Sequence, residues 1–146
     1  MPVRTRAQQD LILAERLVSE VARLPEGTRK IYGGLCHSFP VLVRTCGLCQ
    51  AVAFSADKAT APQGRDEKDR QRAHRLLLRH LGELVAAPGQ APPADVVAVL
   101  RGCGALEYMR LTRRVLSAWI YFKRFAVSIL EVPDARFAEE EQSDAG

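Results

Sequence analysis

Residues 105–132 read ALEYMRLTRRVLSAWIYFKRFAVSILEV and form the longest segment in which apolar residues recur at helical spacing. Apolar residues three or four positions apart fall on one side of a helix. The apolar face is broad here, which is typical of a helix that several neighbours cover. The segment therefore predicts a long C-terminal helix whose buried face consists of Met109, Thr112, Val115, Leu116, Trp119, Phe122, Ala126, Ile129 and Leu130.

The rest of the chain shows the same spacing between breaks at proline and glycine. Two segments, 41–45 and 96–100, also suit strands, but two isolated strands do not make a sheet, so helix is preferred for both. The sequence predicts an all-α fold, a compact bundle of about five to six helices, at residues 6–24, 28–37, 40–55, 67–87, a short stretch after 95, and 105–132.

Several local signals set these boundaries. Thr5 and Gln8 have the spacing of a capping box, and Asp66 is placed to cap a later helix. Pro40 suits the first turn of a new helix, and Gly33 and Gly34 weaken the segment before it. The buried stripes are predicted at Ala7, Leu11, Ala14, Val18 and Val21 in the first helix and at Ala73, Leu77, Leu81 and Leu84 in the segment 67–87.

The length of 146 residues and the mass of 16.1 kDa suit one ordinary domain with a core of its own. We predict a single helical domain at residues 1–133 and an acidic, flexible tail at 134–146, with five acidic residues and one arginine. No apolar run approaches the ~18 residues of a membrane span, and no apolar segment of a secretory signal follows the first basic residues. These features exclude a membrane protein and predict a cytoplasmic one.

The chain is basic, with a net charge of +4, and 17 of its 21 basic residues are arginine. The planar guanidinium group suits phosphate and carboxylate, so this composition favours an anionic partner. The alternative is that these arginines only cover solvated helix faces.

Two basic stripes follow from helical spacing. Lys68, Arg72, Arg75 and Arg79 are spaced 4, 3 and 4 residues apart, opposite the apolar stripe of the same helix. Such rows of basic side chains can follow a phosphate backbone, and a tyrosine among them, as in the second stripe, can stack on a base. The second stripe lies opposite Trp119 and consists of Arg110, Arg113, Arg114, Ser117, Tyr121 and Arg124.

Arg44 interrupts an apolar segment and cannot lose its proton. If that segment is buried, Arg44 needs either an internal carboxylate or an external anion.

The four cysteines do not form the dense framework of a small secreted protein, and we expect reduced thiols. Cys46 and Cys49 have the spacing of a thioredoxin-like redox site, although the other strands of that fold are not predicted. The alternative is that both are small side chains buried in a helix. A zinc site would need Cys36, His37 or Cys103 as well, at no recognised spacing.

No arrangement of residues suits nucleophilic or acid–base catalysis, since His37, His74 and His80 are scattered along the chain. No glycine-rich phosphate loop is present. We therefore expect no enzyme activity, no cofactor, no metal and no small-molecule substrate.

Two blocks of the sequence resemble a known family. The first consists of Ile31-Tyr32-Gly33-Gly34-Leu35 and the segment from Phe39 to Phe54, and the second runs from Tyr108 to Arg113 and from Ala118 to Ala126. Both are similar to blocks of the small subunit of the Cmr complex, the type III-B CRISPR–Cas effector or RAMP module. The resemblance extends from about Thr5 to Val132. At Cys46 and Cys49 the family more often has asparagine and glycine, which favours the small core residues over the redox site.

The resemblance implies a small all-α protein without catalytic activity, several copies of which stack beside other subunits into a filament. That filament lines the groove where guide RNA pairs with target RNA, and other subunits cut the target in antiviral defence. The expected partners are therefore the other subunits of the complex, copies of this chain, guide RNA and target RNA. The matching candidates for RNA contact are Arg44, Arg110, Arg113, Lys123 and Arg124.

Two other functions fit parts of the sequence. One is a helical thiol-redox protein that uses Cys46 and Cys49, and the other is a helical adaptor that binds only protein.

Overall fold

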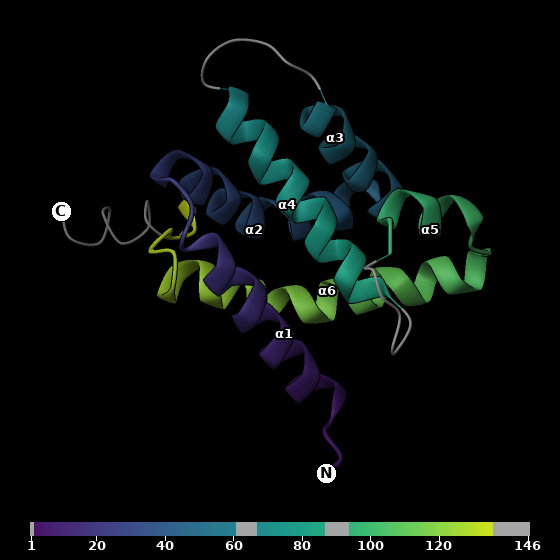
Figure 1. Cartoon of the computed structure of the whole chain (residues 1–146). Coiled ribbons are helices and arrows are strands. Elements are labelled where there is room, and N and C mark those ends of the chain that lie inside the picture. Colours follow the sequence, from purple (N-terminus) through teal and green to yellow (C-terminus); the bar gives the residue numbers. More distant parts are fainter. Residues whose placement is uncertain (1, 61–66, 87–93, 136–146) are drawn as a thin grey trace, which may run out of the picture.

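The computed structural model describes residues 2–60, 67–86 and 94–135. Within them the chain forms six helices and no strand, which confirms the all-α prediction (Figure 1). The segments 41–45 and 96–100 are helical, as predicted. The helices are α1 (Arg6–Val21), α2 (Glu26–Cys46), α3 (Leu48–Thr60), α4 (Glu67–Val85), α5 (Val96–Gly102) and α6 (Ala105–Ser128).

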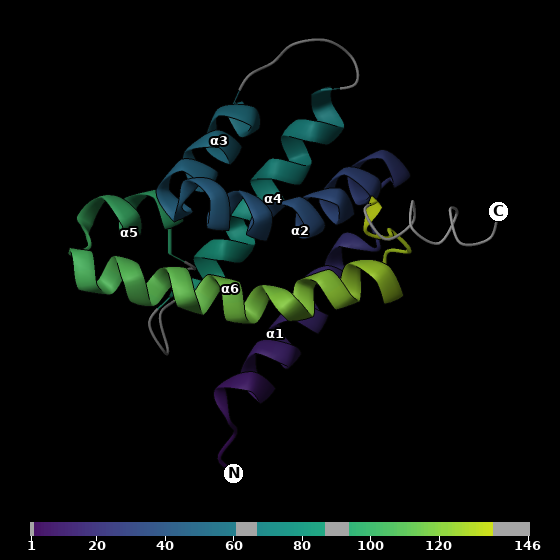
Figure 2. The same ribbon diagram turned by 180° about the vertical axis from the view of Figure 1, so that it is seen from behind.

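The long helix α6 runs across the bundle and packs against α1 and α2 (Figures 1 and 2). Helix α4 packs against α2 and α3. The short helix α5 lies beside the N-terminal end of α6 and contacts α3 and α4. The first turns of α1 project beyond the rest of the bundle in both views. No helix of the described segments combines the length and the apolar character that crossing a membrane requires.

The core is centred on the aromatic residues of α6. The rings of Trp119 and Phe122 are stacked with centroids 4.2 Å apart, and Phe39 of α2 lies 5.3 Å from Trp119. Trp119 and Phe122 are fully buried. The four predicted apolar positions of α4 are all buried, which confirms that helix's stripe.

The boundary predicted between residues 37 and 40 is wrong, because α2 runs straight through Pro40. Proline has no N–H, so the carbonyl of Cys36, four residues earlier, loses its helical partner. The indole Nε1 of Trp119 donates a hydrogen bond to that carbonyl, at 3.0 Å. A side chain of α6 thus provides the bond that Pro40 removes from α2.

The actual break falls at Gly47, between α2 and α3. Gly47 has φ 89°, a conformation that side chains with a Cβ rarely adopt. The hydroxyl of Tyr108 accepts a hydrogen bond from the backbone N–H of Cys49 at 3.1 Å. The long helix α6 therefore holds the start of α3 as well as the middle of α2.

Other boundaries differ less. The capping box of Thr5 and Gln8 is confirmed. The short helix predicted after residue 95 is confirmed as α5, and the structure adds that the carboxylate of Asp95 accepts hydrogen bonds from the backbone N–H groups of Val97 and Ala98. The proposed cap at Asp66 lies outside the described residues. The first helix ends at Val21 and the last at Ser128, short of the predicted 24 and 132.

Two apolar faces were also partly misassigned. Leu11 is 41% and Met109 is 55% exposed, and Ala7 is exposed too, because the first turns of α1 project from the bundle and Met109 lies on the outer side of α6. Leu17 and Leu111 are buried in their place.

Residues 129–135, here called the strap, turn back from α6 onto α2. Glu131 adopts φ 59°, and the N–H of Val132 donates to the carbonyl of Ala126 at 3.0 Å. The Nε2–H of His37 donates to the carbonyl of Val132 at 2.8 Å. Asp134, the first residue of the predicted tail, lies 3.7 Å from the ammonium of Lys123, and the rest of that tail, 136–146, lies outside the described residues.

Candidate nucleic-acid interface

The four basic residues predicted on one face of α4 form a stripe at the surface, here called the ridge, made by Lys68, Arg72, Arg75 and Arg79. Three of them border a hollow of about 300 Å³ beside Leu24, just past the end of α1. Arg75 also donates through Nε to the carbonyl of Ala59 at 3.2 Å, in the last turn of α3. A guanidinium is favourable there because the carbonyls at a helix C-terminus lack helical partners.

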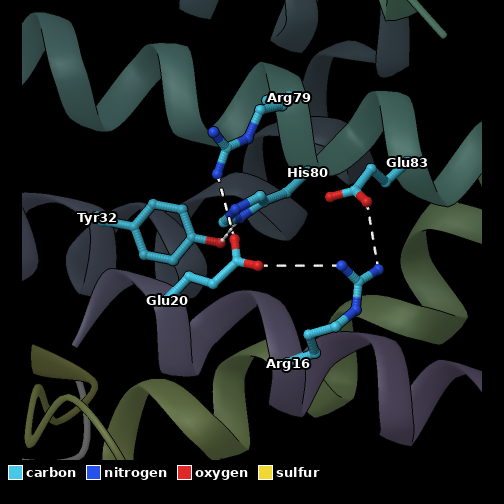
Figure 3. Close-up of polar contacts among 6 residues, drawn as sticks. All are labelled: Arg16, Glu20, Tyr32, Arg79, His80 and Glu83. Atoms are coloured by element: carbon cyan, nitrogen blue, oxygen red, sulfur yellow. Dashed lines mark hydrogen bonds and ion pairs between the residues drawn. The ribbon is translucent and has the colours of Figure 1, made fainter. Parts of the chain in front are cut away.

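Arg79 has a second role, which the sequence did not reveal. Its guanidinium lies 3.3 Å from Glu20, Glu20 lies 3.9 Å from Arg16, and Arg16 lies 3.2 Å from Glu83 (Figure 3). These four residues, here called the ladder, alternate in charge and join α1 to α4. Arg79 is therefore neutralised, which leaves the other members of the ridge as the stronger candidates for an external anion.

Tyr32 and His80 meet beneath the ladder, fully buried (Figure 3). The Tyr32 hydroxyl lies 2.5 Å from Nδ1 of His80. Burial lowers the pKa of His80 to about 3, and the nearby guanidinium groups of Arg79 and Arg16 contribute to this lowering. Burial also raises the pKa of Tyr32 well above its usual value, so both groups are neutral and serve the core.

The second basic surface is a groove of about 600 Å³ between α1, the end of α4 and the first half of α6. Arg110 and Arg113 lie at its edge, while Arg114 is partly buried and forms an ion pair with Asp10 of α1. Asp10 is only 3% exposed, so this ion pair fixes α1 against α6. Six charged residues line the groove. Four are arginines, namely Arg6, Arg110, Arg113 and Arg114, and two are acidic, namely Asp10 and Glu107.

Arg6 and Asp10 also line this groove, and the sequence alone does not point to them. Both lie on α1, and nothing in their local spacing indicates that α1 crosses α6 beside Arg110 and Arg113. Tyr121, which the spacing places in the second basic stripe, is partly buried against the core. Ser117 lines the groove.

The remaining basic candidates lie apart from both surfaces. Arg44 is exposed in the last turn of α2, so the expectation of a buried arginine does not apply. It forms no ion pair with another residue of the described segments. Lys123 is 28% exposed and pairs with Asp134, whereas Arg124 is exposed on the outer side of α6.

Cys46 and Cys49 are both exposed, so the prediction of two buried core thiols is wrong. Gly47 breaks the helix between them, which places Cys46 at the end of α2 and Cys49 in the first turn of α3. Within the described segments no strand precedes the pair, and no three His, Cys, Asp or Glu side chains gather to hold a metal ion. Burial raises the pKa of the Cys36 thiol to about 12.

All three histidines are buried. Burial lowers the pKa of His74 to about 4, with smaller contributions from Arg70 and Lys58. His37 holds the strap. None of the three lies in either basic surface.

The chain is similar to known CRISPR-associated proteins. A family model described as CRISPR-associated protein (Cas_Cmr5) matches residues 6–129. The chain is 32% identical, over 130 residues, to a Thermus thermophilus protein called CRISPR system Cmr subunit Cmr5, covering 88% of this chain and 99% of that one. It also resembles the X-ray crystal structure of a CRISPR-associated Cmr5 family protein from the same organism, with a TM-score of 0.67, 32% identity and coverage of 87% of this chain and 98% of that one. The resemblance noted in the sequence is therefore confirmed, and the chain belongs to the Cmr5 family of CRISPR-associated proteins.

Proposed function

We propose that this chain is a small, non-catalytic subunit of a cytoplasmic Cmr effector complex. Copies of it stack beside other subunits and hold guide and target RNA while those subunits degrade the complementary RNA. Family membership supports the assignment to the complex, since the relative from Thermus thermophilus is called a Cmr subunit.

The observation that carries the RNA-binding part is the groove between α1 and α6. It brings Arg6 from one helix together with Arg110 and Arg113 from another, around the buried pair of Arg114 and Asp10. Guanidinium groups bind phosphate oxygens through paired N–H donors, and the helices on which they stand orient them. The groove thus suits the phosphate backbone of RNA. Phosphate contacts carry no sequence information, so in this proposal the guide determines sequence specificity.

The ridge on α4 is the second contact surface in this proposal. Lys68 and Arg72 form no ion pair within the described segments, so they can bind phosphate without breaking an internal contact. Arg79 belongs to the ladder, and a test of the ridge therefore leaves it in place.

The test uses the assembled complex, purified from its host through a tag on this subunit. Reversing the groove with Arg110→Glu and Arg113→Glu is expected to weaken RNA binding and to lower the dependence of log K on log salt by ~0.7 to 0.9 for each phosphate that is no longer neutralised. The matched control is Arg101→Glu, an exposed arginine in the last turn of α5 outside both surfaces. Lys68→Glu with Arg72→Glu tests the ridge in the same way.

Native mass spectrometry of the same preparation tests the assembly. The proposal expects this chain in several copies, together with other subunits and a short RNA of uniform length. An unchanged RNA affinity and salt slope in both double variants would favour the adaptor that binds only protein. A bare monomer would overturn the proposal, and a loss of activity in Cys46→Ser/Cys49→Ser would favour the thiol-redox protein.

A further inference from the structure

The long helix α6 has a second apolar face, on a side that no other helix of the described segments covers (Figure 2). Four large apolar side chains on this side are 48–63% exposed, namely Leu106, Met109, Ile120 and Val127. Together with the half-buried Leu116 they are here called the outer stripe. Large apolar side chains that gather at a surface mark a contact with another molecule.

The outer stripe has the spacing of a coiled-coil seam. Positions 106, 109, 113, 116, 120, 123 and 127 follow one another at steps of three and four residues, and five of these seven residues are apolar. This spacing forms one straight seam, into which the side chains of a second helix can pack. From residue 106 to residue 127 the seam extends for ~32 Å along the helix axis. A single helix of similar length can therefore cover it.

The described part of the chain supplies no such helix. Trp119 and Phe122 belong to the opposite side of α6, which packs against α1 and α2. The broad apolar face expected from the sequence is thus divided in two, and Met109 lies in the half that the bundle leaves open. A helix that is apolar on two sides needs a neighbour on each of them.

The charges beside the outer stripe indicate what the missing helix carries. Helix α6 contains five basic residues and one acidic residue. Three of the basic residues have acidic partners within the chain, whereas Arg113 and Arg124 are exposed and form no ion pair among the described residues. In coiled coils, side chains beside the seam pair with opposite charges of the partner helix. The helix that fits here therefore has glutamate or aspartate beside its own apolar residues.

Two other occupants fit less well. In a parallel pair with α6 of a second copy, Arg113 would meet the same arginine of that copy. In an antiparallel pair with Leu106 opposite Val127, Arg110 would lie opposite Lys123, and facing like charges disfavour such a contact. A lipid surface is also disfavoured, because Arg113 and Lys123 interrupt the seam itself and lipid chains offer them no hydrogen-bond partner.

We propose that the outer stripe of α6 binds an α-helix of another subunit of the complex, whose apolar seam is flanked by acidic residues. This inference rests on the proposed function, in which the chain is one subunit of a larger assembly. The stripe is separate from the ridge, and it meets the basic groove only at Arg113. The test therefore leaves Arg113 unchanged.

The test uses Ile120→Cys in protein whose other accessible thiols are removed by Cys46→Ser, Cys49→Ser and Cys103→Ser. Cys36 remains, but it is buried and its pKa is raised to about 12, so it does not react. Alkylation by N-ethylmaleimide is followed by mass spectrometry in the isolated chain and in the purified complex. The complex is expected to react about tenfold more slowly, which corresponds to about 1.4 kcal/mol of docking.

Two further positions and one control complete this measurement. Leu106→Cys and Val127→Cys, near the ends of the stripe, are expected to be protected as well, because one helix covers the whole seam. The matched control is Arg101→Cys, an exposed position of α5 outside the stripe, which is expected to react equally fast in both preparations.

An intact complex in which Ile120→Cys reacts as fast as in the isolated chain would overturn this inference alone. Equal protection at Arg101→Cys would also overturn it, since that indicates general shielding. A bare monomer would overturn the proposed function together with the inference, so the two failures are distinguishable.

Photo-cross-linking identifies the partner. With p-benzoylphenylalanine in place of Ile120, cross-links in the complex are expected on one segment of another subunit, at positions three or four residues apart with acidic residues beside them. Cross-links to RNA or to a second copy of this chain would overturn the proposal. So would protection of Ile120→Cys in the isolated chain by vesicles of anionic phospholipid, which would assign the stripe to a lipid surface.

Arg124 tests the charge of the partner. Arg124→Glu is expected to reduce the protection of Ile120→Cys in the complex about threefold at low salt, whereas Arg124→Lys is expected to preserve it. Unchanged protection in Arg124→Glu would refute the acidic flank of the partner helix.

Discussion

The hydrogen bond from Trp119 to the carbonyl of Cys36 leads to a double-mutant prediction. Both residues are fully buried, so water cannot replace the indole N–H if it is removed. Trp119→Phe keeps an aromatic ring but leaves that carbonyl without a partner, because Pro40 cannot donate to it. An unsatisfied buried group costs about 1–3 kcal/mol, in addition to the packing that the smaller ring gives up.

Pro40→Ala restores the missing donor, because the N–H of an alanine at position 40 can bond to Cys36 within the helix. The cost of Trp119→Phe is therefore expected to fall by about 1–2 kcal/mol in the Pro40→Ala background, since the loss of packing is common to both. The matched control is Phe122→Leu, which changes the ring stacked on Trp119 without removing a donor and should cost the same in both backgrounds.

Urea unfolding followed by far-UV circular dichroism measures the four free energies, because Trp119 is the one tryptophan and its fluorescence is lost in the variants. Equal slopes with denaturant would show that the variants unfold over the same surface. A coupling energy below about 0.5 kcal/mol would refute the argument, because independent sites add within that margin.

Three other features lead to predictions about stability: the buried His80, the glycines of α2 and the ion pair of Arg114. The pKa of His80 is about 3 in the folded chain and its ordinary value is 6.5, so the unfolded chain binds a proton first as the pH falls. The contribution of neutral His80 to the free energy of unfolding is therefore fully present above about pH 6.5 and is lost as the pH falls toward 3. The loss is about 2–3 kcal/mol at about pH 4.5. In urea titrations at different pH values, His80→Gln should flatten this dependence. A Cβ at Gly33 would lie 2.6 Å from Val132, while one at Gly34 meets nothing within 4 Å. In thermal unfolding, Gly33→Ala should therefore destabilise the chain by about 1–3 kcal/mol, whereas Gly34→Ala should stabilise it by up to about 1 kcal/mol. A change in stability of the same sign for both variants would contradict the packing of the strap on α2. Arg114→Met leaves the buried carboxylate of Asp10 without its partner and should cost about 3–5 kcal/mol in urea unfolding. Asp10→Asn should cost less, because the Arg114 side chain is 18% exposed and can turn to water. Equal costs for the two variants would contradict this ion pair.

Helical periodicity and caps were sufficient to predict most of the fold. The buried stripe of α4 and the capping box at Thr5 depend on residues close in sequence, and the structure agrees with both. Pro40 was misjudged because its missing donor is replaced by Trp119, a residue of α6 that bonds to Cys36 across 83 positions of the chain. Patterns among residues that are close in sequence cannot identify such a distant partner.

The candidate site could be predicted only in part for the same reason. The spacing of Arg110 and Arg113 shows that they share a face of α6, but not that Arg6 of α1 joins them. Likewise, Arg79 fits the ridge by spacing, and its neutralisation depends on Glu20 of another helix. Cys46 and Cys49 are exposed because the helix breaks at Gly47 between them. The sequence did not predict this break, because Pro40 was expected to begin a helix that continues through Gly47.

The ladder also separates two positive regions along the line where α1 and α4 meet. The ridge begins past the C-terminal end of α1 and the groove lies at its N-terminal end, with two carboxylates between them. Changing Glu20 and Glu83 to glutamine would remove both carboxylates of the ladder and free the guanidinium groups of Arg16 and Arg79 from their ion pairs, without adding a single basic residue. If these surfaces bind RNA as proposed, the length of RNA that they contact depends on the acidic side chains between them as much as on the basic ones.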